Sequence, residues 1–358
     1  MSQASKAGRR DDVRVAEGLT AWGAGYFSSP HWRVIDLVRP SSGWANETVV
    51  ITVEGHAHRG AAERFVVRMP AVIPVFPSYD LEAQAVVLQR VREGGVPAPS
   101  PVAVEGDEDW VGAPFLVMSY EEGRPGPEVP TLDRWLLDAP VDSQRRLHES
   151  FVQAIARVHA VDWHLDGLGT ALRGGTDGSL AEEVRWWASY VDWATDASPP
   201  SLLDEALDWC AATAPSVSSS PSLCWGDARI GNVLFGESGE IRAVLDWELA
   251  SIGVGEMDVG WTVVLDGLIE LFTGRRVPGF MRRDEVIACY ERSAGRELHD
   301  LEWHELFALT RSVAVAERLS MVAALGGIEY PGGGGNDHPV LRELARRIDD
   351  YEGEAPAG

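Results

Sequence analysis

The stretch WGDARIGNVLF (residues 225–235) carries the clearest signal in this chain, and the run IRAVLDWE (241–248) completes it. Three polar side chains, Asp227, Asn232 and Asp246, stand in or beside short apolar runs. A half-buried carboxylate or amide is costly unless it is hydrogen-bonded, ion-paired or bound to a metal. Three such side chains near strand ends therefore predict a functional site more than a packed core.

The length and composition are those of a soluble globular protein with two domains or lobes: 358 residues, 45% hydrophobic and 24% charged. No apolar run approaches the roughly 18 residues needed to cross a bilayer. The N-terminal MSQASKAGRRDD lacks the apolar region of a signal peptide, so we expect a tail there. Three widely spaced cysteines, Cys210, Cys224 and Cys289, favour neither a disulfide framework nor a zinc site, and fit a reducing cytoplasm.

The formal net charge of −24 argues against nucleic acid or an anionic membrane as a partner, because both need a basic face. Two explanations of the acidity stay open. It can serve solubility in an acidic or salt-adapted proteome, or it can form an acidic cleft that attracts a cationic substrate.

The chain changes its pattern near residue 122. Before it, short β-branched runs separated by turns predict an antiparallel sheet, interrupted by one helical segment, YDLEAQAVVLQRVREGG. After the Gly- and Pro-rich EEGRPGPEVP, helical spacing dominates, at 180–195, 202–213, 256–273, 283–294, 300–326 and 338–352. We expect an α+β chain made of a tail and first helix (1–30), a β-rich N-terminal lobe (31–122) and a helical C-terminal lobe (123–358).

The segment WGDARIGN followed by VLDWE resembles the catalytic loop of the aminoglycoside phosphotransferase family, whose fold is similar to that of protein kinases. The family pattern is His-Gly-Asp, four residues, Asn, and then a strand ending in Asp; here Trp225 stands in place of the His. The form GDxRxGN…LDWE is similar to the branch that includes actinobacterial phosphotransferases and the kinase-like domains fused to some acyl-CoA dehydrogenases. The resemblance runs from about Ser41 to the C-terminal helices and implies a two-lobed, protein-kinase-like fold.

Phosphoryl transfer needs a carboxylate that orients the acceptor hydroxyl and takes its proton, and oxygen ligands for Mg²⁺ at the phosphates. By resemblance, Asp227 is the catalytic base, and Asn232 and Asp246 are the magnesium ligands. The alternative is structural: Asp227 as a turn residue and Asn232 as a left-handed residue, which are common roles of these types.

The resemblance also implies that the N-terminal lobe binds ATP, with GTP as a further possibility. SSGWANET (41–48) occupies the place of the loop that covers the nucleotide. Gly43 would give backbone access there, and Ser41, Ser42 and Asn46 would offer donors to phosphate oxygens. Taken alone, the stretch also fits an ordinary hairpin turn. The chain has no GxxxxGK[ST] motif, so a P-loop enzyme is excluded.

Kinase-like folds pair a lysine on the third strand with a helix glutamate to hold the α- and β-phosphates. Here that strand position is Arg68, and the helix offers Glu82. Arg is a rigid planar fork and Lys a compact point charge, but an Arg can still hold two phosphate oxygens. We therefore expect Arg68 and Glu82 to pair at the phosphates, and a surface salt bridge is the alternative. The run LVMSYEEG then resembles the hinge, where the backbone of Ser119, Tyr120 and Glu121 would bond the adenine edge.

Other residues near the motif have two explanations each. Arg229 can reach the transferred phosphate, pair with a neighbouring carboxylate or lie on the surface. Glu248 can support the metal or cap the next turn. Asp258 matches a family aspartate that braces the catalytic loop, and Trp225 is expected to pack where the family has its His.

The acceptor site is expected among the C-terminal helices. Aromatic residues at helical spacing are more often core than ligand box, yet interleaved acids would suit an amine through charge and cation–π contacts. The two helical runs in question carry Trp186, Trp187, Tyr190, Trp193, Asp266 and Glu270, and the lobe also offers Arg185, Arg275 and Arg276 for an anion. The sequence assigns none of them individually to the acceptor.

Residues and resemblance together predict an ATP- and Mg²⁺-dependent O-phosphotransferase, a kinase for a small-molecule hydroxyl. An aminoglycoside antibiotic, which would make this a resistance enzyme, is slightly favoured as the acceptor. A hydroxy acid or another small metabolite is the alternative. A non-catalytic nucleotide-binding pseudokinase is favoured only by Trp225 and Arg68. A monomer or homodimer in the cytoplasm is expected.

Overall fold

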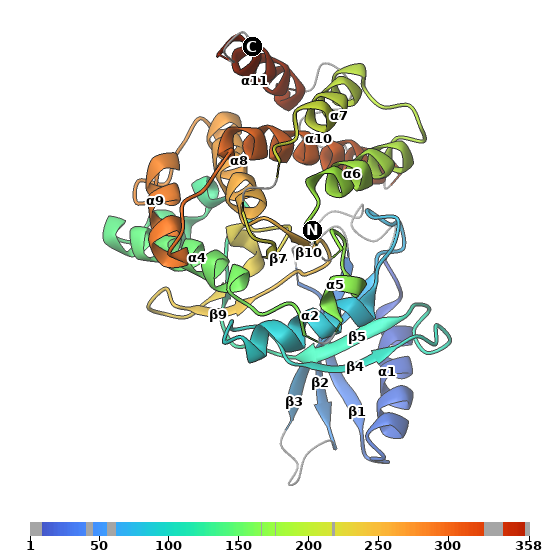
Figure 1. Cartoon of the computed structure of the whole chain (residues 1–358). Helices are drawn as coiled ribbons and strands as arrows, with labels where there is room; N and C mark the ends of the chain where they lie inside the picture. The colour runs from blue at the N-terminus through green and yellow to red at the C-terminus, as the bar shows by residue number, and fades with distance from the viewer. Residues whose placement is uncertain are drawn as a thin grey trace.

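The computed structural model describes residues 9–40, 46–55, 62–165, 167–175, 177–216, 219–325 and 339–354. It has a five-stranded antiparallel sheet near the N-terminus and a largely helical part after it (Figure 1). The α+β, two-lobed fold expected from the sequence is therefore confirmed. Among the described helices, none combines the length and the hydropathy needed to cross a lipid bilayer.

The sheet has the order β1-β2-β3-β5-β4, and every neighbouring pair is antiparallel. Its strands are β1 (Arg33–Val38), β2 (Asn46–Glu54), β3 (Glu63–Pro70), β4 (Pro101–Glu105) and β5 (Phe115–Ser119). Burial alternates along β2 because its side chains point to opposite faces in turn. Val49, Ile51 and Val53 pack under α1 (Asp12–Tyr26), which covers the outer face.

The helix α2 (Leu81–Glu93) packs on the face that turns toward the C-terminal lobe (Figure 1). Asp80 caps its start by accepting the backbone N–H of Ala83 at 2.8 Å. Gly95, at a φ of +81°, follows its end. The single helical segment predicted in the first lobe is confirmed.

The second lobe is built from helices with short strands between them. The helices are α3 (Arg134–Leu137), α4 (Val141–His159), α5 (Leu168–Ala171), α6 (Leu180–Ala194), α7 (Ser201–Thr213), α8 (Glu256–Thr273), α9 (Arg283–Ala294), α10 (Leu301–Leu325) and α11 (Pro339–Glu354). The short strands are β6 (Arg124–Pro125), β7 (Ser222–Cys224), β8 (Val233–Phe235), β9 (Ile241–Val244) and β10 (Ser251–Gly253), and the 3-10 turns are η2 (Pro130–Leu132) and η3 (Ile230–Asn232).

The segment between β3 and α2 fastens the lobes together. Val75 and Phe76 are buried in the hydrophobic core of the C-terminal lobe. The Tyr190 hydroxyl donates to the Val75 carbonyl at 3.1 Å, and the Arg318 guanidinium donates to the Pro74 carbonyl at 2.7 and 3.0 Å. The five-stranded sheet is thereby held against α6 and α10.

Candidate active site

The loop from Trp225 to Asn232 is held in place by Asp258, in the first turn of α8. Asp258 accepts the backbone N–H of Trp225 at 2.6 Å and that of Gly226 at 2.8 Å. Gly226 has a φ of +87°, and a Cβ there would lie 2.1 Å from the Leu249 carbonyl oxygen, so glycine is required. The bracing role expected of Asp258 is confirmed.

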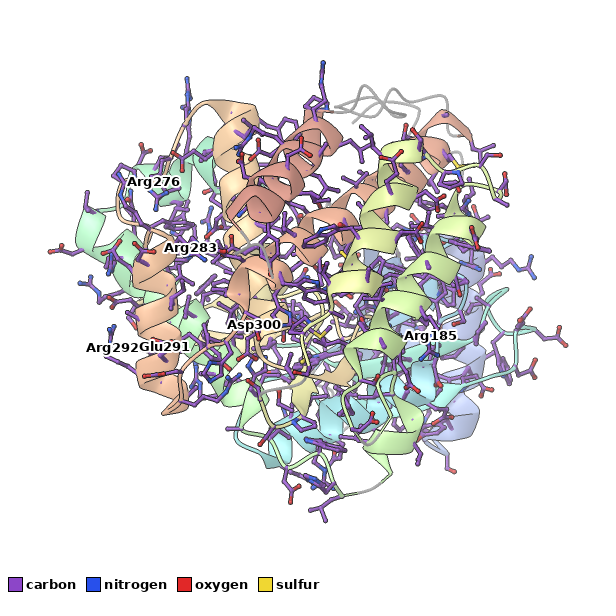
Figure 2. All side chains as sticks on the ribbon, turned by 45° about the horizontal axis from the view of Figure 1, so that its top comes forward. Arg185, Arg276, Arg283, Glu291, Arg292 and Asp300 are labelled. Atoms are coloured by element: carbon purple, nitrogen blue, oxygen red, sulfur yellow. The ribbon has the colours of Figure 1, made fainter. Side chains whose placement is uncertain are left out.

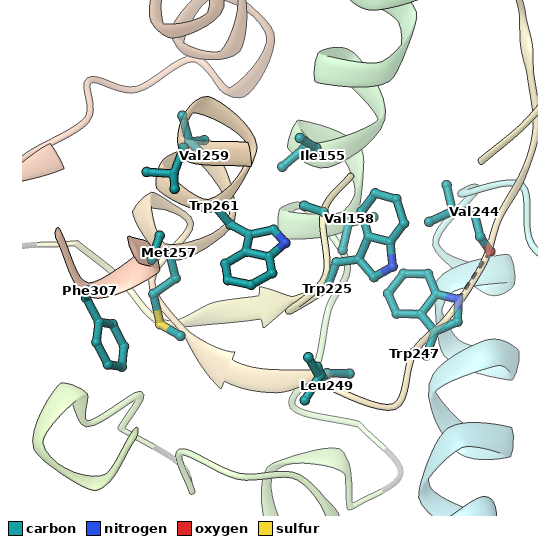
Figure 3. Packing of buried hydrophobic residues seen from close by; sticks show 14 of the residues in the cluster. Ile155, Val158, Trp225, Val244, Trp247, Leu249, Met257, Val259, Trp261 and Phe307 are labelled. Carbon is teal, nitrogen blue, oxygen red and sulfur yellow. Dashed lines mark hydrogen bonds between the residues drawn. The ribbon is translucent and has the colours of Figure 1, made fainter. Parts of the chain in front are cut away.

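Trp225 packs in the core beneath this loop and also makes hydrogen bonds. Its ring centroid lies 5.9 Å from that of Trp247 (Figure 3) and 6.3 Å from that of Phe151. The indole N–H donates to the carbonyl oxygens of Leu245, at 2.8 Å, and Asp246, at 3.1 Å. The tryptophan therefore ties the loop to the segment that carries Asp246.

Asp227 has donors on both carboxylate oxygens. Oδ1 accepts the indole N–H of Trp261 at 2.9 Å. Oδ2 accepts the Asn232 amide at 2.7 Å and the Arg229 guanidinium at 2.9 Å. Arg229 also pairs with Glu128, so it lies inside the site as an ion-pair partner and not on the free surface. These donors fix the direction in which the Asp227 carboxylate points.

Asp246 has a φ of +62°, a left-handed conformation that a non-glycine residue adopts at some expense in strain. Its carboxylate pairs with Arg68, whose guanidinium also lies 3.2 Å from Glu248. Asn46, at the start of β2, donates its amide to Glu248. Burial, and then the neighbouring Asp246 carboxylate, raise the pKa of Glu248 to about 8. Glu248 thus belongs to the site and does not cap a turn on the surface.

The expected pairing of Arg68 with Glu82 is wrong. Arg68 pairs with Asp246 and Glu248 across the lobes, and Glu82 is exposed on α2. The physical reason is the helical period. Leu81, Gln84 and Leu88 form the buried face of α2, and a residue one position after Leu81 is turned about 100° away. Gln84 and Leu88 are the described α2 side chains that line the site.

A cavity of about 670 Å³ lies where the lobes meet, a volume typical of small-molecule sites. Apart from Glu82, the predicted site residues that the structure describes all line it: Asn46, Arg68, Ser119, Tyr120, Glu121, Asp227, Asn232 and Asp246. The three other predicted residues, Ser41, Ser42 and Gly43, lie outside the described residues.

The donors of Ser119 are already used inside the protein. Its backbone N–H donates to the Ser100 carbonyl at 2.8 Å, and its hydroxyl donates to Glu121 at 2.6 Å. Of residues 119–121, which line the cavity, Ser119 therefore has no donor left over for a ligand.

Two buried residues, Trp261 and Arg311, support the loop without having been singled out from the sequence. Trp261 stands three residues after Asp258, on the same face of α8, and this spacing is the only signal that could have found it. Arg311 comes from α10, donates to the Gly226 carbonyl at 2.7 Å and lies 4.6 Å from the Trp261 ring centroid. Burial lowers the pKa of the Arg311 guanidinium. No local pattern marks it.

A sheet-and-helix pair of lobes with Asp, Asn and Asp around one cavity defines a kinase-like phosphotransferase architecture. The model of the phosphotransferase enzyme family matches residues 36–298, and the chain belongs to that family. Acyl-CoA dehydrogenase family member 10 of Mus musculus is 25% identical over 232 residues, which are 64% of this chain and 20% of that protein. The chain thus spans about a fifth of that relative's length.

Solved structures share the fold at low sequence identity. A provisionally named aminoglycoside phosphotransferase from Ralstonia eutropha superposes with a TM-score of 0.70 at 19% identity, covering 96% of this chain and 99% of that one. A thermostable mutant of the aminoglycoside phosphotransferase APH(4)-Ia, in a ternary complex with ADP and hygromycin B, gives 0.56 at 14% identity, covering 92% and 98%. The likeness to both is one of fold.

Proposed function

We propose that this protein transfers the γ-phosphoryl group of ATP to a hydroxyl of a small molecule. The observation that carries the proposal is that Asp227, Asn232, Asp246 and Arg68 line one cavity between the lobes. The solved structure of similar fold that holds ADP and hygromycin B supports a nucleotide and a small acceptor in such a cavity. GTP in place of ATP is the other nucleotide to test.

Asp227 is proposed as the base that orients the acceptor hydroxyl and takes its proton. Its carboxylate is fixed by Trp261 on one oxygen and by Asn232 and Arg229 on the other. A base held in one direction by such donors places the hydroxyl in line with the phosphorus, which is most of what phosphoryl transfer asks of a protein.

Asn232, Asp246 and Glu248 fit a magnesium site. All three offer oxygen, the ligand that Mg²⁺ prefers, and all three line the cavity. The side-chain amide nitrogen of Asn232 donates to Asp227, and the side-chain Oδ1 of Asn232 has no described hydrogen bond. When bound, Mg²⁺ supplies charge neutralisation at the phosphate oxygens.

Arg68 and the hinge are proposed to hold the nucleotide. The Nε of Arg68 and the Oδ1 of Asn46 are buried and have no hydrogen-bond partner, and a buried polar atom of this kind points to a missing ligand. Val50 and Val66 from the sheet and Leu234 from the other lobe line the same cavity and offer apolar surface to a planar adenine. Tyr120 and Glu121 would meet the base edge through their backbone.

The alternative of a pseudokinase depends partly on Trp225, which replaces the His of the family pattern. The indole N–H of Trp225, however, keeps the loop bonded to Leu245 and Asp246. We therefore favour an active enzyme. We place it in the cytoplasm, since Cys210, Cys224 and Cys289 are free thiols buried in the fold. A monomer or homodimer is the proposed assembly.

The test is ADP release from Mg²⁺·ATP, measured with and without candidate alcohols. Acceptor-stimulated ADP release that disappears in Asp227→Asn would support phosphotransfer. Nucleotide binding without stimulation by any alcohol would support the pseudokinase instead.

A further inference from the structure

Two helices of the C-terminal lobe supply an apolar part of the cavity lining, which we call the acceptor end. It consists of Trp261 and Leu265 of α8 and Val315, Ala316 and Leu319 of α10. Trp261 places this lining beside Asp227, because its indole N–H bonds the carboxylate of the proposed base.

The Ser312 hydroxyl, a polar group that α10 adds to this lining, already has a hydrogen-bond acceptor within its own helix. Ser312, also on α10, lines the cavity, but its hydroxyl donates to the Leu309 carbonyl of its own helix at 2.7 Å. The charged cavity residues next to the base, Arg229 and Glu128, are paired with each other. An acceptor here would therefore meet hydrocarbon, the base and this ion pair.

The acids expected to attract a cation face another way. Asp266 lies 3.1 Å from His148 of α4, and Glu270 pairs with Arg276 at 2.9 Å. Both line a separate pocket of about 20 Å³. Because each step along a helix turns by about 100°, Leu265 faces the large cavity while Asp266 faces α4. In the described parts of α8 and α10, no carboxylate lines the large cavity.

The aromatic faces expected to receive an amine are occupied by the protein's own cations. Arg173 lies 4.0 Å from the Trp186 ring centroid and Arg318 lies 4.3 Å from that of Trp193. The Arg311 guanidinium likewise lies over the rings of Trp187 and Trp261. An amine brought to this region would meet guanidinium groups in place of open ring faces.

Arginines that would suit an anionic acceptor also lie elsewhere. Figure 2 shows Arg185 and Arg276 on separate sides of the helical lobe. Neither lines the large cavity, and Arg276 is paired with Glu270. The acceptor end is thus poor in free charge of either sign.

From this lining we infer that the acceptor is an alcohol whose hydroxyl is carried on an uncharged, apolar body that lies along α8 and α10. The inference rests on the proposed phosphotransfer and names its substrate class. The acceptor oxygen bonds to the γ-phosphorus, the bond from that phosphorus to the β,γ-bridging oxygen breaks, ADP leaves, and Asp227 takes the hydroxyl proton. The lining favours an uncharged acceptor, whereas the acidic sequence suggested a cationic one.

The experiment uses straight-chain 1-alkanols from ethanol to octanol as acceptors, with Mg²⁺·ATP, and kanamycin in parallel. Each buried methylene should raise kcat/KM for ADP release by roughly 3–4-fold until the cavity is filled. Kanamycin should give no stimulation. A flat response along the series, or stimulation by kanamycin alone, would overturn the apolar acceptor, and the second result would leave phosphotransfer standing.

Variants locate the effect. Leu319→Asp places a carboxylate at the acceptor end and should lower kcat/KM for octanol by at least about tenfold, while the Kd for ATP stays unchanged. Leu319→Thr, a milder change, serves if the first variant folds poorly. Leu271→Asp is the matched control, because Leu271 is 55% exposed on α8 and outside the cavity. Equal loss in Leu271→Asp, or none in either Leu319 variant, would contradict the proposal.

Calorimetry separates this inference from the proposed function. Octanol should bind the protein loaded with a non-hydrolysable ATP analogue, and Leu319→Asp should weaken that binding. Binding of this kind without ADP release would sustain the apolar site and remove phosphotransfer. Failure of every alkanol to bind would remove the apolar site.

Discussion

Trp225 donates its indole N–H to the backbone carbonyl of Asp246, joining the loop of the proposed base to the proposed metal ligand. The family pattern has His at this position. A ring N–H donor is retained in the exchange, together with a larger apolar surface that packs on Trp247 (Figure 3). The departure from the pattern is thus compatible with an ordered site.

Removing that donor should loosen the site. Trp225→Phe leaves the Leu245 and Asp246 carbonyls without their partner and a space in the core, so we expect a loss of roughly 1–3 kcal/mol in the free energy of unfolding. Affinity for Mg²⁺·ATP should also fall. Trp163→Phe is the control, since its indole bonds the Pro221 carbonyl outside the large cavity, and its loss should spare nucleotide affinity. Unchanged affinity in Trp225→Phe would sink the idea that this bond positions Asp246.

Asp227→Asn should lower turnover by roughly 10²–10⁴-fold, the usual range for a general base, and leave nucleotide binding intact. The measurement is ADP release at saturating ATP beside calorimetric titration of ATP. Glu270→Gln, outside the large cavity, should keep full activity. An Asp227→Asn enzyme with normal turnover would remove the assignment of the base.

Arg68→Ala should raise the Kd for ATP by roughly 10–150-fold, since a charge-assisted hydrogen bond is worth about 1.5–3 kcal/mol. It should also destabilise the fold, because Asp246 and Glu248 lose their buried counter-charge. Arg33→Ala, which breaks an exposed pair between Arg33 of β1 and Glu54 of β2, is the control. If a folded Arg68→Ala variant binds ATP normally, the arginine only bridges the two acids.

Acid should destabilise the protein through His304. Burial lowers the pKa of this α10 side chain to about 4, from an ordinary value of 6.5. The unfolded chain then binds more protons between these values, so the stability contributed by neutral His304 is present above pH 6.5 and is lost as pH falls toward 4. The contribution of His304 to the free energy of unfolding should fall by about 2 kcal/mol between pH 7 and pH 5, while Glu248, whose folded pKa is raised, changes stability in the opposite direction.

Denaturant titrations at both pH values check this. His304→Phe should show a shallower loss than the wild type, and His164→Gln, at an exposed position, should follow the wild type. Identical slopes for His304→Phe and the wild type would contradict the expectation.

Much of the fold could be read from periodicity. The alternation in β2 and the helical spacing after residue 122 gave the two lobes, and the spacing of Asp227, Asn232 and Asp246 gave the centre of the candidate site. The face of a helix was harder to predict. Glu82 in α2 was assigned to the wrong side, because a one-residue error turns a side chain by about 100°.

Long-range partners could not be predicted. Arg311 reaches Gly226 across 85 positions of sequence, and Arg68 finds Asp246 across 178. Such contacts depend on how the helices pack, which local residue patterns do not encode.

The segment from Pro74 to Tyr79 has a consequence for how the molecule melts. Val75 and Phe76 belong to the same hydrophobic cluster as Leu88 of α2 and Phe151 of α4. Unfolding either lobe would strip apolar cover from the other, so heat should melt the two together in one cooperative transition. The sheet with its helix is accordingly not a transplantable unit: cut away after β5, it would carry an open hydrophobic face and aggregate.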